Sequence, residues 1–460
     1  MAVSNVPKYH IAMFPWFAMG HMTPLLHLAN EIAKRGHTIT YFMPRKAQLK
    51  LQHLNLYPDL ITFHTITIPH IDGLPPGTEI ATEIPISLCP LLVETSDLTQ
   101  DQIELAFRAN KPNFVVHDNA HWMPRLAKQL GIKSICYDVV SAATLALVFV
   151  PGRNFPKDRP ITEEDLSQLP PGYPSSKVVF RGHEIRPLMM ITMPMGKNIT
   201  FYERMVKAKK DSDAIAIRTC EELEGKLCEY MVAQYKKPVL FTGPVLSAED
   251  MKTPLEDRWD KWLGGLNPGS VVYCSFGSEF ILEKDQFEEL VFGFEVTGLP
   301  FLIALKTPRG CATIEEALPE GFEERVKGRG VVYGGWVQQP LILKHPSVGC
   351  FVSHCGASSM WESLMSDCQI VLVPQLIDQV LNTRQLAEEL EVAVEVKREE
   401  NGWFTKESLS NAIKSVMDSD SEVGVKVKNN HAKWKEILGK PEFMSGYADR
   451  FVQNLHDLVK

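Results

Sequence analysis

The sequence predicts an α/β protein built from two domains of similar architecture. Short apolar runs typical of buried strands alternate with amphipathic runs typical of helices, and this alternation begins near residue 10 and resumes after residue 254. Such an order implies parallel sheets that are covered by helices on both faces. With 460 residues, the chain is long enough for two domains, each with its own core.

The first half contains one helix start that is clearly marked. Thr23 and Pro24 fit the N-cap and the first residue of a helix, because that first position needs no N–H donor. We therefore expect a loop over residues 15–22 and a helix that ends at Gly36. Strands are predicted at residues 10–14, 37–43, 61–66, 114–117, 134–137 and 214–217.

The second half repeats this order. Residues 243–254 contain a polar, Pro-containing stretch, and we place the domain boundary there. Residues 154–176, rich in Pro, Asp and Gly, are expected to form a surface excursion of the first domain. The predicted domains are 1–246 and 255–438, followed by a terminal segment, 439–460, with a helix near 447–459. Strands are predicted at residues 271–275, 301–305, 331–333, 348–353 and 369–372, with a helix at 284–297.

Composition and charge restrict the class of protein. Apolar residues make up 45% and charged residues 23% of the chain, as in soluble globular proteins. The net charge of -8 argues against nucleic acid or an anionic membrane as a partner. A bound phosphate would therefore be held locally, by helix ends and hydroxyl groups.

The cysteines and the apolar start of the chain lead us to expect a cytoplasmic protein. The nine cysteines include no C-x-x-C pair, so neither a disulfide framework nor a zinc site is suggested. Residues 11–20 are interrupted by Pro15 and are too short to span a bilayer, and no small-residue cleavage site follows a basic leader. We interpret this run as a core strand.

One stretch has the pattern of an anion-binding turn. The small residues of His354-Cys-Gly-Ala-Ser-Ser359 lie between the predicted strand 348–353 and a helix expected to begin at residue 360. Such a turn leaves the first N–H groups of the helix free to bind phosphate. The alternative is a capping box, in which Ser359 and Glu362 satisfy the helix's own donors and bind no ligand.

A longer pattern surrounds this turn. Residues 336–379 contain Trp336-Val-Gln-Gln339, His345-Pro346, His354-Cys-Gly356, Ser359, Glu362-Ser363, Pro374 and Asp378-Gln379. In order and spacing this segment closely resembles the nucleotide-sugar signature of plant family-1 UDP-sugar glycosyltransferases. Further fragments, among them PWFAMGHMTP at 15–24 and SVVYCSFGS at 270–278, extend the resemblance through most of the chain.

The resemblance implies two Rossmann-like domains that face each other across a ligand cleft, the GT-B arrangement, with the terminal helix packing back on the first domain. It also implies roles for single residues. The uracil and ribose would be bound by Trp336, Val337, Gln339 and Glu362. The diphosphate would lie among Ser278, His354, Gly356, Ser358 and Ser359, and the donor sugar beside Ala357, Asp378 and Gln379.

Two positions depart from the family's pattern. The family usually has an aromatic residue at position 357 and often Asn at 358, where this chain has Ala357 and Ser358. A contact from the backbone N–H of Ala357 to the sugar would survive, whereas the wall of the cleft loses bulk. Ser358 offers a phosphate fewer hydrogen-bonding groups than Asn does.

His21 and Asp118 are candidates for acid-base chemistry. Taken singly, a loop histidine is most often structural, and an aspartate before a helix is most often its N-cap. Both residues follow strands predicted in the same sheet, however, where their side chains can meet. A carboxylate on one imidazole nitrogen leaves the other nitrogen to accept a hydroxyl proton. The resemblance places the base and its aspartate at these two positions.

These expectations describe an inverting glycosyltransferase that uses a UDP-sugar, with no metal and no cofactor. By resemblance, the chain is similar to the branch that adds a sugar to a flavonoid or anthocyanin 3-O-glucoside. We expect glucose as the donor sugar, the 2''-hydroxyl as acceptor, a monomer, and walls of the acceptor site from Trp16, Phe17 and Trp122. UDP-xylose or UDP-rhamnose as donor, and a phenolic aglycone or terpenoid hydroxyl as acceptor, are the alternatives.

Rival classes of protein lack their motifs. An oxidoreductase of similar fold needs G-x-G-x-x-G between a strand and a helix, and no such run occurs. Residues 264–270 lack the lysine of a P-loop, which argues against phosphoryl transfer. A protein that holds a UDP-sugar without turnover would fit residues 336–379 alone, but the presence of His21 and Asp118 argues against it.

Overall fold

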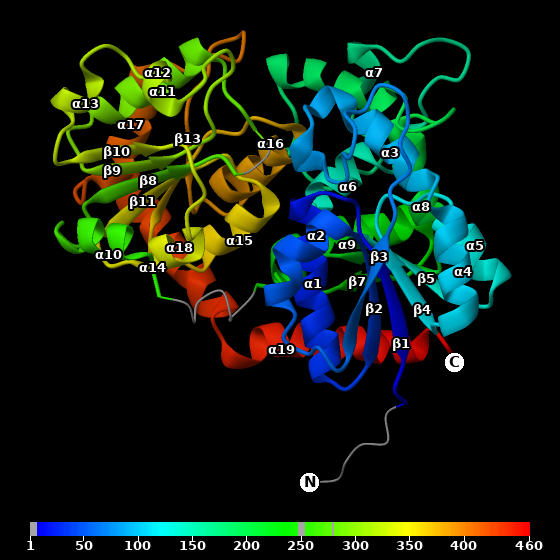
Figure 1. The fold of residues 1–460 in the computed structure, drawn as a ribbon. Helices are drawn as coiled ribbons and strands as arrows, with labels where there is room; N and C mark the ends of the chain where they lie inside the picture. The colour runs from blue at the N-terminus through cyan, green and yellow to red at the C-terminus, as the bar shows by residue number, and fades with distance from the viewer. Residues whose placement is uncertain (1–6, 247–253, 278–279) are drawn as a thin grey trace. The chain divides into compact units, whose positions relative to one another are not determined.

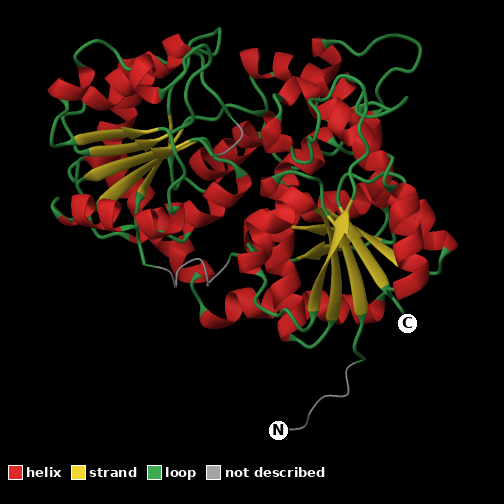
Figure 2. Ribbon diagram, viewed as in Figure 1, coloured by secondary structure: helices red, strands yellow, loops and turns green. Residues whose placement is uncertain are grey.

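Two parallel sheets organise the chain (Figure 1). The computed structural model describes residues 7–246, 254–277 and 280–460. The first sheet has seven strands in the order β3-β2-β1-β4-β5-β6-β7, and the second has six in the order β10-β9-β8-β11-β12-β13. Helices flank the strands of each sheet (Figure 2). The predicted α/β class is therefore confirmed, with the strand order of a Rossmann-like fold in both sheets.

The strands lie close to their predicted positions. The two short edge strands β7 and β13 were not predicted. In the first sheet the strands are β1 (His10–Phe14), β2 (Thr38–Pro44), β3 (Ile61–Ile66), β4 (Phe114–His117), β5 (Lys133–Asp138), β6 (Ala214–Ile217) and β7 (Val239–Phe241). In the second they are β8 (Val271–Ser275), β9 (Phe301–Ala304), β10 (Gly330–Tyr333), β11 (Val348–Ser353), β12 (Gln369–Leu372) and β13 (Val394–Glu395).

The helices connect these strands. Around the first sheet they are α1 (Met19–Lys34), α2 (Arg45–Leu51), α3 (Cys89–Asp97), α4 (Gln100–Asn110), α5 (Met123–Gln129), α6 (Ala142–Val148), α7 (Glu163–Ser167), α8 (Phe201–Asp211), α9 (Glu221–Tyr235) and α19 (Pro441–Asp457). Around the second they are α10 (Asp257–Gly264), α11 (Lys284–Glu295), α12 (Ile314–Ala317), α13 (Phe322–Arg325), α14 (Gln339–Lys344), α15 (Ala357–Leu364), α16 (Ile377–Arg384), α17 (Lys406–Met417) and α18 (Glu422–Leu438).

Each sheet is buried on both faces. In β1, Ile11 and Met13 belong to one apolar core and Ala12 and Phe14 to another. The same alternation occurs in β8, where successive residues enter two different cores. Because successive side chains of a strand point to opposite faces, apolar residues at every position are what a sheet between two helical layers requires.

The first helix begins earlier than predicted. α1 starts at Met19, so Thr23 is not its N-cap and Pro24 lies inside it. Pro24 has no N–H to donate to the carbonyl of Gly20, so that bond is missing from the second turn. The correction matters for function, since His21 lies on the first turn of a helix rather than in a loop.

The division into domains also differs from the predicted one. One compact unit contains Met1–Pro174, Leu188–Leu246 and Pro441–Lys460, and the other contains Ser175–Pro187 and Ser247–Lys440. Within the first unit, α19 contacts α1 and β7. The assignment of all of 1–246 to the first domain was wrong for Ser175–Pro187, because its side chains pair with residues of the second unit.

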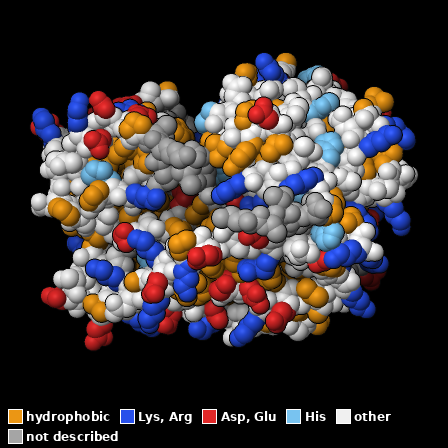
Figure 3. Space-filling view, turned by 90° about the horizontal axis from the view of Figure 1, so that it is seen from below, with side chains coloured by type: hydrophobic (Ala, Val, Ile, Leu, Met, Phe, Trp, Pro, Cys, Tyr) orange, Lys and Arg blue, Asp and Glu red, His pale blue; other side chains and the backbone are white. Residues whose placement is uncertain are grey.

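Charges of both signs are spread over the surface. On the face drawn in Figure 3, basic and acidic side chains of the described residues are interspersed rather than gathered in one basic patch. Among the helices in the described ranges, none is long and apolar enough to cross a membrane.

The close approach of β11 to the turn before β8 makes Gly349 a sensitive position. The register between these strands shifts between Val348 and Cys350, and a Cβ on Gly349 would lie 2.0 Å from the carbonyl oxygen of Gly269. Gly349→Ala should therefore lower the free energy of unfolding by about 1 to 3 kcal/mol in urea titrations. Gly264→Ala, where an added Cβ meets no atom within 4 Å, is the control. Equal midpoints for the two variants would contradict this account of the strand.

Candidate active site

The structure brings His21 and Asp118 together within the first unit. The parallel pairing of β1 with β4 aligns Phe14 with His117, so Asp118 follows β4 at the sheet edge where β1 also ends. Nδ1 of His21 lies 2.9 Å from Oδ2 of Asp118. The aspartate side chain is only 5% exposed, whereas 27% of the histidine side chain is exposed. The carboxylate is thus enclosed while the imidazole remains accessible.

Asp118 is fixed by backbone donors as well as by His21. Its Oδ2 accepts the N–H of Trp16 at 2.9 Å, and its Oδ1 accepts the N–H of Asn119. It does not act as an N-cap, because α5 begins at Met123 with Trp122 as the preceding residue. An ionised carboxylate in this position accepts a hydrogen bond from Nδ1–H of His21, which selects the tautomer whose Nε2 carries the lone pair that can accept a hydroxyl proton.

Further ionisable groups lie behind this pair, and the sequence analysis did not single them out. Asp138, at the end of β5, forms an ion pair with Lys209 at 2.8 Å, and both side chains are buried. A hydrogen bond of 3.1 Å joins Nε2 of His117 to Oγ of Ser212. Burial lowers the pKa of His117 to about 4, so its imidazole is neutral near pH 7. Asp138 and His117 both lie close enough to Asp118 to interact with its charge.

Two of the three predicted acceptor walls are core residues. Phe17 has no exposed surface and Trp122 is buried, and both belong to the same apolar core. The indole N–H of Trp122 donates to Asp97 at 3.0 Å. The prediction that these two side chains line the acceptor site was therefore wrong. Trp16 is partly exposed and stacks on Phe17, with ring centroids 5.9 Å apart, so it alone of the three can face a ligand.

A pocket of about 380 Å³ lies in the second unit, where several predicted nucleotide-binding residues meet. Trp336 is 76% exposed, which excludes a core aromatic and suits a ring that a base could stack on. Val337 is buried, as expected if its backbone rather than its side chain contacts a ligand. The pocket is lined by Tyr273, Ser275, Gly277, Ala304, Leu305, Lys306, Gly334, Gly335, Trp336, Val337, Gln339, Pro340 and Glu362.

Glu362 faces this pocket and is oriented by a neighbouring amide. Nε2 of Gln339 donates to Oε2 of Glu362 at 2.7 Å and to Oγ of Ser359 at 3.2 Å. Oε1 of Gln339 accepts a hydrogen bond from the hydroxyl group of Tyr273 at 3.2 Å. Gln339 therefore links the carboxylate of Glu362 to Tyr273, and this hydrogen bond was not predicted from the sequence.

The capping-box alternative is excluded. α15 begins at Ala357, with Gly356 as its N-cap and no side-chain cap, so Ser359 lies within the first turn. The expected start at residue 360 was wrong because the helix includes the small residues of the turn. The N–H groups at the start of α15 accordingly come from Ala357, Ser358 and Ser359, which are the residues predicted to surround the diphosphate and the donor sugar.

His354 is a buried, neutral member of the turn. Burial lowers its pKa to about 4. A Cβ added to Gly277 would lie 2.8 Å from Nε2 of His354, and a Cβ added to Gly356 would lie 2.6 Å from it. Any larger residue at either position would therefore displace the ring. Cys355 adopts a φ of 61°, and its N–H donates to Oγ of Ser353 at 3.1 Å. The predicted Ser278 lies outside the described residues.

Asp378 and Gln379 lie on the first turn of α16. Gln379 is buried, and its Oε1 accepts the N–H groups of Gln375 at 2.9 Å and Leu376 at 3.0 Å. The amide oxygen of Gln379 therefore closes the turn before α16. The amide nitrogen, Nε2, is the donor that Gln379 can offer a ligand. One helical turn later, Asn382 donates to the carbonyl of Cys355 at 2.9 Å, which ties α16 to the turn that carries His354.

Lys306 is a basic residue of the pocket that the sequence analysis missed. It follows β9, as Asp118 follows β4, so the rule that ligands lie beyond the carboxyl ends of parallel strands could have identified it. No group of His, Cys, Asp and Glu side chains that could hold a metal ion occurs in the described ranges.

Comparisons with known proteins agree with this geometry. Residues 267–430 match the family model described as UDP-glucoronosyl and UDP-glucosyl transferase. UDP-glycosyltransferase 79B6 of Arabidopsis thaliana is 55% identical over 98% of both chains. Anthocyanidin 3-O-glucoside 2'''-O-xylosyltransferase of the same plant is 54% identical over 98% of this chain and 97% of its own length.

Solved structures share the fold. UGT73P12 of Glycyrrhiza uralensis superposes with a TM-score of 0.80 at 21% identity, covering 98% of this chain and 96% of that one. A UDP-glucose:anthocyanidin 3-O-glucosyltransferase in complex with UDP gives 0.77 at 23% identity, covering 98% and 99%. At these identities the likeness concerns the fold alone, whereas the identities above 50% over nearly the whole chain establish the family. The chain belongs to the plant family-1 UDP-glycosyltransferases.

Proposed function

We propose that this glycosyltransferase moves glucose from UDP-glucose to the 2''-hydroxyl of a flavonoid or anthocyanin 3-O-glucoside, with inversion at the anomeric carbon. The observation that carries the chemistry is the 2.9 Å contact between Nδ1 of His21 and Oδ2 of Asp118. A relative named as a xylosyltransferase of an anthocyanidin 3-O-glucoside supports the class of acceptor. In the family that residues 336–379 resemble, Gln at the last position of the segment usually accompanies glucose, so Gln379 supports glucose as the donor sugar.

His21 acts as the general base in this scheme. Its Nε2 takes the proton of the acceptor hydroxyl, whose oxygen attacks the anomeric carbon as the bond from that carbon to the phosphate oxygen breaks. The electron pair leaves with UDP. Asp118 stabilises the imidazolium that forms, as the buried aspartate beside the catalytic histidine does in serine proteases. A sugar hydroxyl is less acidic than a phenol, so this reaction depends strongly on a well-oriented base.

The leaving diphosphate is met by neutral donors. The N–H groups at the start of α15 and the hydroxyls of Ser358 and Ser359 offer hydrogen bonds to the charge that develops on it. His354 contributes a neutral N–H and no full charge, since its pKa is held near 4. Neither a metal ion nor a cofactor enters the scheme.

Removal of the base should slow turnover without loss of the nucleotide. His21→Ala should lower kcat by roughly 10²-fold to 10⁴-fold, because the proton then has no acceptor. UDP affinity measured by calorimetry should stay unchanged. His53→Ala, at an exposed histidine of the first unit, is the matched control. Near-normal turnover of His21→Ala would refute the assignment.

The carboxylate of Glu362 should bind the ribose of UDP. Glu362→Gln keeps the size of the side chain but removes the charge that strengthens hydrogen bonds from two hydroxyl groups. We expect a loss of about 1.5 to 3 kcal/mol in the free energy of UDP binding by calorimetry. Glu324→Gln, at an exposed glutamate of the second unit, should bind UDP normally. Unchanged affinity of Glu362→Gln would exclude the ribose contact.

Protonation of His354 should contribute to acid sensitivity. Its pKa is about 4 in the folded chain and about 6.5 when unfolded, so the unfolded state binds the proton first as the pH falls between these values. The free energy of unfolding should therefore drop between pH 7 and pH 5, and His354→Gln should remove roughly 2 kcal/mol of that drop. Urea titrations at both pH values measure it, with His53→Gln as control. An identical drop in wild type and His354→Gln would contradict the neutral state.

Competition experiments test the substrates. Given quercetin and quercetin 3-O-glucoside together, with UDP-glucose and UDP-xylose at equal concentration, the enzyme should convert the glucoside with glucose. Mass spectrometry of the products separates both choices, and fragmentation locates the new bond on the first sugar. Preferential conversion of free quercetin would favour direct glycosylation of a phenol, and a pentose in the product would overturn the proposed donor.

A further inference from the structure

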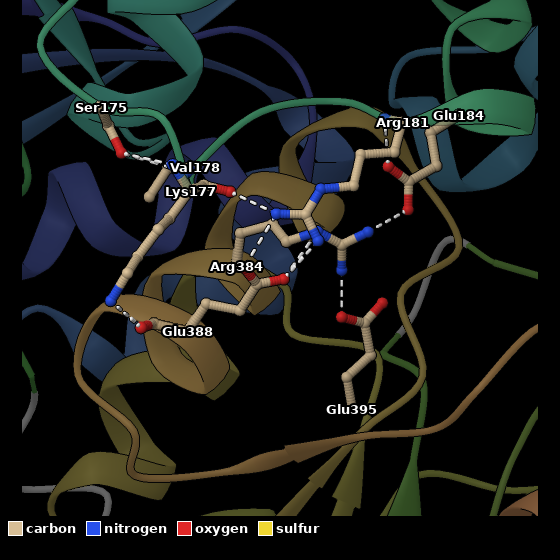
Figure 4. A network of polar contacts seen from close by, with 8 residues as sticks. All are labelled: Ser175, Lys177, Val178, Arg181, Glu184, Arg384, Glu388 and Glu395. Carbon is tan, nitrogen blue, oxygen red and sulfur yellow. Dashed lines mark hydrogen bonds and ion pairs between the residues drawn. The ribbon is translucent and has the colours of Figure 1, made fainter.

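The short segment Ser175–Pro187 belongs to the second unit although its neighbours in sequence belong to the first. It is held there by a buried ion pair: Nη2 of Arg384 donates to Oε1 of Glu184 at 2.5 Å, and each side chain is only 6% exposed (Figure 4). Arg384 is the last residue of α16. The segment is therefore bound to the C-terminal end of α16, whose first turn carries Asp378 and Gln379.

Further ion pairs and hydrogen bonds hold the segment Ser175–Pro187 against the turn that follows α16. Arg181 forms a two-point ion pair with Glu388, at 2.6 and 2.8 Å, and Lys177 donates to the carbonyl of Glu388 at 2.9 Å. Glu388 lies in the π-helical turn Gln385–Glu389 that continues α16. The N–H of Arg181 in turn donates to Oε2 of Glu184 at 2.7 Å, which fixes the carboxylate that Arg384 uses.

The same network reaches the turn before α16. Arg384 also pairs with Glu395 of β13. Arg398 lies close enough to Glu395 to interact with its charge, and its Nη2 donates to the carbonyl of Pro374 at 2.5 Å. Pro374 directly precedes Gln375 and Leu376, whose N–H groups bind Gln379. Charged contacts therefore fix both ends of the stretch that presents Asp378 and Gln379.

We propose that Glu184, through Arg384, is a positioning residue for recognition of the donor sugar. The inference rests on the proposed role of Asp378 and Gln379 toward that sugar. α16 is short and continuous, so a displacement at Arg384 is transmitted to its first turn. The pocket that holds the nucleotide is lined by residues of other elements, so its own contacts do not depend on this ion pair.

The proposal separates binding of UDP from binding of UDP-glucose. In Glu184→Gln, calorimetry without acceptor should show the Kd for UDP-glucose raised roughly 2- to 30-fold, the range of long-range couplings, while the Kd for UDP stays within twofold of wild type. Steady-state kinetics should show the same rise in KM for UDP-glucose at an unchanged KM for the acceptor. Glu295→Gln, which removes a carboxylate that pairs with Arg325 at 2.6 Å in the same unit, is the matched control.

A single change leaves Arg384 buried without its partner and is expected to be destabilising. If Glu184→Gln does not fold, the double variant Glu184→Gln/Arg384→Gln, which removes both charges, is judged by the same ratio of Kd values. Equal weakening of UDP and UDP-glucose, or no weakening of either, would overturn the proposal. Wild-type protein that gains no affinity from the glucose moiety and transfers no sugar would instead defeat the proposed function together with this inference, so the two failures can be told apart.

Discussion

Parallel strand pairing is the constraint on which the chemistry of this protein depends. When all strands of a sheet run the same way, their carboxyl ends share one edge, and the turns that follow them are forced to be neighbours. The pairing of β1 with β4 thereby sets Asp118 beside the helix that carries His21, although 97 positions separate the two residues. In the second sheet the same rule gathers the turns after β8, β9 and β10, together with Glu362 of α15, around one pocket.

The turn between β11 and α15 shows how closely packing restricts the residues that are proposed to bind the diphosphate. A buried imidazole occupies its centre, and Gly277 and Gly356 are required beside it because a Cβ at either position would overlap the ring. His354 and Gly356 follow β11, whereas Gly277 follows β8. This steric restriction therefore couples the turns after two strands. The neutral state of His354 follows from the same burial. A diphosphate bound here, as we propose, would be met by aligned N–H groups and hydroxyls rather than by a charged imidazole, as expected for a chain whose own net charge is -8.

Apolar periodicity and strand-end positions were sufficient to predict the fold class, most strands and the meeting of His21 with Asp118. Predictions failed where long-range packing overrides a local signal. Thr23-Pro24 has the local pattern of a helix start, yet α1 begins at Met19, with Ala18 in an extended conformation as its N-cap. Phe17 and Trp122 were placed at the acceptor site by proximity in sequence, but their ring surfaces complete the core behind β1. The hydrogen bond from Gln339 to Glu362 joins α14 to α15, and the sequence of neither helix predicts it.

The segment Ser175–Pro187 illustrates a further kind of information that periodicity does not contain. Its sequence contains the charged residues Lys177, Arg181, Glu184 and Arg186, and nothing in their spacing predicts where their partners lie. The partners of Glu184 and Arg181 lie some 200 positions away, at Arg384 and Glu388. A buried ion pair adds little net stability compared with apolar packing, but it imposes a direction, because each charge must meet its partner at one distance and angle. If α16 presents Asp378 and Gln379 to the donor sugar, as we propose, it benefits from that restriction more than from stability itself. This is why we assign the ion pair to the orientation of α16.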